Sequence, residues 1–142
     1  MKPPQIVLDT NVIIAAQRSK RGASAKLMSL IGTGRFEIHL SVPLVLEYEE
    51  VLLRQRVLLG LTPDDVNDLV DALCALAHHH KIYFLWRPYL RDAKDELILD
   101  LAVAAQCNYI ITHNQKDFVE TEKFGIQVLD PKTFLKEMGE LK

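Results

Sequence analysis

The stretch that decides the fold is Ile6-Val7-Leu8-Asp9-Thr10-Asn11, an apolar run that ends in three polar residues. The run follows Pro3-Pro4 and is typical of a short strand that is buried on both faces of a sheet. The apolar residues 12–16 (VIIAA) come next and predict that the chain passes directly from the sheet into a helix. A carboxylate at this junction stands where open α/β sheets bind their ligands. Asp9 is therefore a candidate functional residue, although an acid here also serves as a plain helix cap.

Length and composition limit the possible classes of protein. The chain has 142 residues, of which 49% are apolar and 25% charged, and this balance predicts one globular domain over residues 1–142. The net charge is −2, so a nucleic acid would have to bind a local basic patch. The sequence has neither a signal segment nor an apolar run near the ~20 residues that span a bilayer. Two separated cysteines, Cys74 and Cys107, are expected as buried thiols, and we expect a cytoplasmic protein without a membrane partner.

Segments with strand and helix patterns alternate along the chain. Further strands are expected at residues 36–40 (FEIHL), 82–86 (IYFLW), 109–112 (YIIT) and 127–129 (QVL). Helices are expected at 23–31, 42–54, 63–80, 97–105 and 131–138, with start signals at Ser41, Thr62-Pro63 and Asp130-Pro131. This order predicts an α/β fold, a three-layer α/β/α sandwich around a mostly parallel, roughly five-stranded sheet.

Four of the five histidines have a plain structural interpretation. His39 falls on the polar phase of its strand and is expected to be solvated. His78, His79 and His80 are expected at the end of a helix, where they suit the helix dipole. Consecutive helix residues point roughly 100° apart and cannot easily hold one ion, so a metal role is not favoured for these three.

Polar side chains recur at the ends of the expected strands. Asp9 ends the first strand, Glu47 lies early in the helix after the second, Asp95 opens the helix before the fourth, and Asn114 and Asp117 follow the fourth. Because the carboxyl ends of parallel strands meet at one edge, we expect these side chains to gather there. Clustered carboxylates repel one another unless cations compensate them. Oxygen ligands without a Cys or a His pair suit Mg²⁺ or Mn²⁺, ions that assist phosphoryl chemistry.

Each of these acids also has an ordinary explanation. Glu47 stands beside Glu49 and Glu50, as a solvated helix acid would, and Asp95 and Glu96 suit the first turn of a helix. The joint occurrence of the acids nevertheless favours a site. The sequence has no GxSxG, no plausible Cys–His pair, no Walker loop and no GxGxxG, which argues against a covalent nucleophile and a nucleotide cofactor.

Four stretches in order resemble the PIN domain, specifically its toxin-like branch related to VapC-type ribonuclease toxins. They are 9–15 (DTNVIIA), 41–54 (SVPLVLEYEEVLLR), 95–102 (DELILDLA) and 111–118 (ITHNQKDF). The resemblance implies a Mg²⁺- or Mn²⁺-dependent endoribonuclease that cleaves single-stranded RNA. It also implies the toxin component of a toxin–antitoxin pair, with a cognate antitoxin protein as partner.

The resemblance assigns roles residue by residue. The acids of the family fall on Asp9, Glu47 and Asp95, with Asn114 at the fourth position and Asp117 close behind. A shift of one residue would place Glu96 at the third position, and Asp100 matches a further acid of this branch on the same helix face as Glu96. The metal ligands are therefore expected among Asp9, Asp95, Glu96 and Asp100. The polar supporting residues of the family match Thr10, Asn11 and Thr112.

Basic residues near these motifs are expected to contact RNA. They are Lys20, Arg21, Arg54 and Arg91. The apolar faces of the helices at 23–31 and 62–80 are candidates for a homodimer interface, and members of the family commonly pair.

Two other functions stay open at this point. The neutral Asn114 keeps open a catalytically weak PIN-like module that acts through protein or RNA binding. A phosphatase of the haloacid-dehalogenase type would use Asp9 as nucleophile and would need a second Asp two residues on, where this chain has Asn11.

Overall fold

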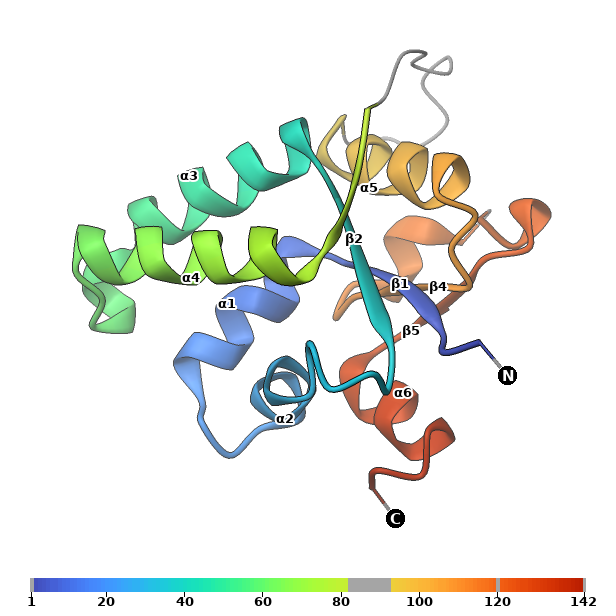
Figure 1. Cartoon of the computed structure of the whole chain (residues 1–142), viewed down its shortest axis with the longest axis horizontal. Coiled ribbons are helices and arrows are strands. Elements are labelled where there is room, and N and C mark those ends of the chain that lie inside the picture. The colour runs from blue at the N-terminus through green and yellow to red at the C-terminus, as the bar shows by residue number, and fades with distance from the viewer. Residues whose placement is uncertain (1, 82–92, 120, 142) are drawn as a thin grey trace.

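The computed structural model describes residues 2–81, 93–119 and 121–141. Its five strands form one sheet in the order β3-β2-β1-β4-β5, and every pair is parallel (Figure 1). The strands are β1 (Gln5–Leu8), β2 (Glu37–Ser41), β3 (His78–His80), β4 (Tyr109–Ile111) and β5 (Gln127–Leu129). The predicted α/β fold with a mostly parallel sheet is confirmed.

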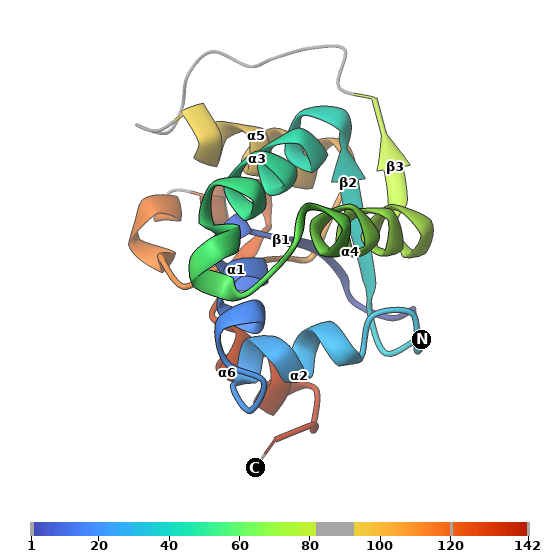
Figure 2. The ribbon, with the colours of Figure 1, turned by 90° about the vertical axis from the view of Figure 1, so that its left-hand side faces the viewer.

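In the described ranges, six α-helices connect and cover these strands. They are α1 (Thr10–Arg18), α2 (Ala23–Ser29), α3 (Val42–Leu59), α4 (Pro63–Leu76), α5 (Ala93–Ala104) and α6 (Pro131–Glu137). Helix α5 packs on β1, β2 and β4, and both views show it on one side of the strands with α2 and α6 on the other (Figures 1 and 2). Helices α3 and α4 lie side by side.

None of the helices in the described ranges has both the length and the apolar character needed to cross a membrane.

The first strand lies at the centre of the sheet, and Ile6, Val7 and Leu8 are all buried. Its pairing is unequal on the two sides. With β4 the register continues to Leu8↔Ile111, whereas with β2 the last pair is Ile6↔Ile38. The two strands β1 and β2 therefore separate at their carboxyl ends, which is where α3 begins.

The predicted helix starts are confirmed by their hydrogen bonds. The Thr62 hydroxyl accepts from the Asp65 amide at 3.0 Å, and the Asp65 carboxylate accepts from the Thr62 amide at 2.9 Å, which forms a complete capping box at the start of α4. The Asp130 carboxylate accepts from the Thr133 amide at 2.6 Å and caps α6. Ser41 caps α3 in the same way.

The prediction for His78, His79 and His80 is wrong. Helix α4 ends at Leu76, and the three histidines form the edge strand β3, with His39 opposite His78. The cause is tertiary, because parallel pairing with β2 satisfies backbone groups that a longer helix would have satisfied internally. The strand predicted at residues 82–86 lies outside the described residues.

The prediction of a solvated His39 is also wrong, because β3 covers it and leaves only 6% of the residue exposed. Its hydrogen bonds fix its tautomer. The Gln5 amide nitrogen donates to the Pro3 carbonyl and the Glu37 carboxylate, so the Gln5 Oε1 must accept from His39 Nε2. Neutral His39 then accepts at Nδ1 from His80 Nε2, at 2.7 Å. A chain of hydrogen bonds thus crosses the sheet, in which His80 on β3 donates to His39 on β2 and His39 donates to Gln5 on β1.

We expect the stability of the protein to fall as the pH falls from about 6.5 toward 4. Burial, and then the neighbouring His80 and His78, lower the pKa of His39 from 6.5 to about 4, so in this window the unfolded chain binds a proton that the folded chain rejects. Urea unfolding at pH 7, 6 and 5 measures the effect. The variant His39→Gln should show a smaller loss between pH 7 and 5, with a remainder from His80, whose pKa burial also lowers. An equal loss in both proteins would contradict this account.

Candidate functional site

A cavity of about 530 Å³ opens at the carboxyl ends of the central strands. Four carboxylates from separate parts of the chain line it: Asp9 after β1, Glu47 on α3, Asp95 on α5 and Asp117 on the 3-10 helix after β4. Thr10, Asn11 and Asn114 line the same cavity. The topology thus brings together residues that are up to about a hundred positions apart, as expected for a parallel sheet.

The carboxylate of Asp9 bonds to side chains beyond the helix that it precedes. Asp9 occupies the N-cap position of α1 but makes no capping hydrogen bond with its side chain. Its Oδ2 instead accepts from the Thr112 hydroxyl at 2.7 Å and from the Asn11 amide nitrogen at 3.3 Å. With 9% of the residue exposed, Asp9 faces the cavity from a nearly buried position, so plain capping does not explain it.

Thr112 links the ends of the two central strands. The residue has no exposed surface, and its hydroxyl donates to Asp9 while it accepts from the Asn11 side chain at 3.2 Å and the Asn114 amide at 3.0 Å. These bonds use the single donor and both acceptor positions of the hydroxyl. The Asn11 Oδ1 also accepts from the His113 amide at 3.2 Å. The orientation of Asp9 is therefore fixed by a saturated network.

The electrostatics of the cavity favour a cation. Burial raises the pKa of Asp9, the Thr112 hydrogen bond opposes this shift, and the Asp117 carboxylate raises the pKa further. The candidate metal ligands are carboxylate oxygens and the side-chain amide oxygen of Asn114, which suit Mg²⁺ or Mn²⁺. Within the described parts of the chain, no three His, Cys, Asp or Glu side chains form a group that could hold an ion by themselves. Waters would therefore complete the coordination, as they commonly do around Mg²⁺.

Glu47 has a cationic partner inside the site. The Lys94 Nζ lies 3.3 Å from the Glu47 Oε1, with 53% of the lysine side chain and 11% of the glutamate side chain exposed. A solvated helix acid, the ordinary explanation of Glu47, does not describe this position. The ion pair also connects α3 with α5 across the cavity, so it brings positive charge next to the acids.

Helix α5 presents one of its three candidate acids to the cavity. Asp95 is part of the lining, whereas Glu96 and Asp100 lie outside it. Asp100 is buried, and burial followed by the nearby Glu96 raises its pKa. The helical phase of α5 thus separates Asp95 from the other two acids.

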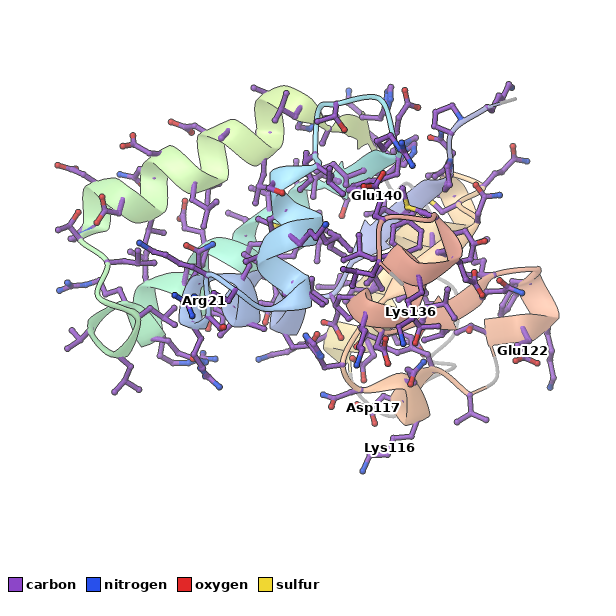
Figure 3. The ribbon with its side chains drawn as sticks, turned by 90° about the horizontal axis from the view of Figure 1, so that it is seen from below. Arg21, Lys116, Asp117, Glu122, Lys136 and Glu140 are labelled. Atoms are coloured by element: carbon purple, nitrogen blue, oxygen red, sulfur yellow. The ribbon has the colours of Figure 1, made fainter. Side chains whose placement is uncertain are left out.

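The candidate RNA-binding residues are distributed over different surfaces. Arg54 lines the cavity. Lys20 and Arg21 lie outside the lining, in the loop between α1 and α2, and Figure 3 shows Arg21 apart from Asp117. Arg91 lies outside the described residues.

Four polar residues of the lining were not predicted from the sequence: Arg18, Gln55, Lys94 and His113. Helical spacing contained the signal for two of them. Arg18 follows Asn11 by seven residues on α1, and Gln55 follows Glu47 by eight on α3, so each pair shares a helix face. His113 is held by a contact of 2.9 Å between its Nε2 and the Ser24 hydroxyl, which only the tertiary structure reveals.

The all-parallel sheet and the acids at its strand ends define an α/β protein with a ligand site at the carboxyl edge. A model of the PIN domain matches residues 5–116, and the chain belongs to this family, whose members are typically metal-dependent nucleases. The chain is also similar in fold to a chain of the crystal structure of VapBC2 from Rickettsia felis bound to a promoter DNA fragment. The TM-score is 0.63 at 15% identity, over 89% of this chain and 99% of that one. Comparison with curated proteins gives no match.

We expect Thr112→Val to lower the free energy of unfolding by about 2 kcal/mol, because it removes a hydrogen bond to a buried carboxylate. It should also raise the pKa of Asp9 further, since the Thr112 bond opposes the effect of burial. Urea unfolding and a carboxyl-carbon NMR titration measure the two effects.

A matched control is Thr121→Val. Thr121 is equally buried, but its hydroxyl donates to the Phe118 carbonyl, outside the cavity lining. This variant should lose only about 1 kcal/mol and leave the titration of Asp9 unchanged. The same change in the pKa of Asp9 in both variants would show that Thr112 has no specific role.

Proposed function

We propose that the protein is a Mg²⁺- or Mn²⁺-dependent endoribonuclease that cleaves single-stranded RNA. The observation that carries the proposal is the meeting of Asp9, Glu47, Asp95 and Asp117 around one cavity in a chain of the PIN domain family. The saturated network around Thr112 supports it, because a buried carboxylate held in one orientation is suited to a ligand role.

Asp9 and Asp95 are the residues that would hold the ion, assisted by Asp117 and the Asn114 side chain. A bound Mg²⁺ or Mn²⁺ supplies positive charge for the phosphate and lowers the pKa of a bound water. Thr112 and Asn11 keep the Asp9 carboxylate aimed at the cavity. Glu47, held by Lys94, is placed to accept a proton from a water in the cavity.

The lining also offers groups that suit an RNA strand. Arg18, Arg54 and Lys94 supply positive charge for phosphates beside the acids. Ile14, Ala15, Val51 and Ile98 form the apolar part of the lining. The cavity of about 530 Å³ is in the size range of small-ligand pockets and leaves room for a short segment of an unpaired strand.

We further propose that the protein is the toxin of a toxin–antitoxin pair in the cytoplasm, with a cognate antitoxin as partner. The similarity of fold to a VapBC2 chain supports this role. The predicted homodimer stays a prediction. Helices α2 and α4, which were predicted to contribute to it, line a common apolar groove with Met28 and Leu73 among its residues.

We expect Asp9→Asn to reduce cleavage of a mixed single-stranded RNA by about a hundredfold or more, which corresponds to roughly 3 kcal/mol of transition-state stabilisation. The variant should remain folded. Burial raises the pKa of Asp9, so its ionised form costs folding free energy at neutral pH, and the neutral Asn removes that cost. The assay compares Mg²⁺, Mn²⁺ and EDTA.

The matched control is Asp68→Asn, an exposed acid on α4 outside the cavity, which should cleave like the parent. Cleavage that survives in Asp9→Asn would place the site elsewhere. A folded parent that cleaves no RNA with either metal would favour the binding module that the neutral Asn114 leaves open.

We expect Arg54→Gln to raise the KM for RNA severalfold and to reduce the slope of log KM against log salt by about one, as the loss of one phosphate contact does. Arg56→Gln is the control, since Arg56 lies on the same helix but outside the lining. Equal effects in the two variants would point to general charge attraction instead of a contact at the cavity.

A further inference from the structure

A buried phenol lies directly behind the proposed site. Tyr48 follows Glu47 on α3, has only 1% of its surface exposed, and donates a hydrogen bond from its hydroxyl to the carbonyl of Leu8. Leu8 is the residue before Asp9. One hydrogen bond therefore connects the immediate neighbours of two of the four carboxylates.

The geometry of the sheet explains why the Leu8 carbonyl needs this partner. The Asp9 amide donates to the Ile111 carbonyl of β4 at 2.9 Å. In a trans peptide the N–H and the preceding carbonyl point in opposite directions, so the carbonyl of Leu8 faces the side of β2. The pairing of β1 with β2 has already ended at Ile6↔Ile38. The Tyr48 hydroxyl takes the place of the missing strand and satisfies a buried carbonyl.

This bond joins α3 to the carboxyl end of β1, where β1 no longer pairs with β2. Asp9 reaches the cavity from the end of β1, and Glu47 reaches it from α3, which starts where the two strands separate. Thr112 fixes the Asp9 side chain from the β4 side. Tyr48 fixes the backbone before Asp9 from the α3 side, and its ring is packed on all sides.

We propose that Tyr48 is a positioning residue that sets the spacing between Asp9 and Glu47, an inference that rests on the proposed nuclease function. The ring of Tyr48 is enclosed by the core, and its hydroxyl bonds to the Leu8 carbonyl, so the bond is a fixed constraint between α3 and the end of β1. A displacement of either acid on the ångström scale is sufficient to slow a reaction strongly.

The test is Tyr48→Phe, which removes one oxygen and keeps the buried ring. The control is Tyr109→Phe, because Tyr109 lies at the first residue of β4, packs its ring on Phe134, and lies outside the cavity lining. We expect Tyr48→Phe to weaken Mn²⁺ binding and to lower kcat, each by about tenfold, with an unchanged KM for RNA. Tyr109→Phe should stay within about twofold of the parent in all three quantities.

A purely structural role predicts a different pattern. Tyr48→Phe would then lower the thermal midpoint, while Mn²⁺ affinity and kcat measured well below that midpoint would equal those of the parent. That result would overturn the proposal.

A second readout separates this inference from the proposed function. Hydrogen exchange without metal or RNA reports on the Asp9 amide and on the Val12 amide, which donates to the Asp9 carbonyl at 3.0 Å. We expect both amides to exchange severalfold faster in Tyr48→Phe and unchanged in Tyr109→Phe. If the parent cleaves no RNA, faster exchange still supports the spacing role and only the nuclease function falls. Unchanged exchange overturns the spacing role.

Discussion

The hydrogen bond from the Thr112 hydroxyl to the Asp9 carboxylate joins the ends of the two central strands inside the protein. An ionised carboxylate loses most of its hydration when it is buried, and the hydrogen bonds from Thr112 and Asn11 offset only part of that loss. The nearby Asp117 increases the cost. The fold tolerates this arrangement because β1 is buried among strands on both sides and cannot move Asp9 out to solvent. The remaining features of the site are built around this fixed carboxylate.

The surroundings of the acids distribute charge in a consistent way. Lys94 compensates the charge of Glu47 within the cavity, and Arg18 and Arg54 line the same cavity. Burial raises the pKa of Asp9, and the nearby Asp117 carboxylate raises it further. Negative charge gathers around Asp9 and Asp117, which is where a divalent ion is attracted, while Lys94 and Arg54, paired with Glu47 and Glu50, bring positive charge to the same lining.

Local signals in the sequence were sufficient for much of the fold. The apolar run before Asp9 and the caps at Thr62 and Asp130 act over a few residues, and the structure contains each of them. His78–His80 could not be predicted in the same way, because these residues form a strand only through pairing with β2, which is distant in sequence. The choice among Asp95, Glu96 and Asp100 depends on the rotation of α5 against the sheet. This rotation is set by the packing of α5 on the sheet, so the spacing of the acids in the sequence cannot predict it.

The early end of the pairing between β1 and β2 has a consequence for how such a chain can vary. Space for the cavity exists because the two strands separate after Ile6, and Tyr48 bridges the gap at a fixed distance along α3. A residue inserted between Leu40 and Glu47 would rotate the helix by about 100° and move its acid to another face. An insertion in the loop between α1 and α2 would not rotate a helix in this way, since both ends of the loop lie at the surface. We therefore expect changes in length to be tolerated in that loop and not in the short junction from strand to helix.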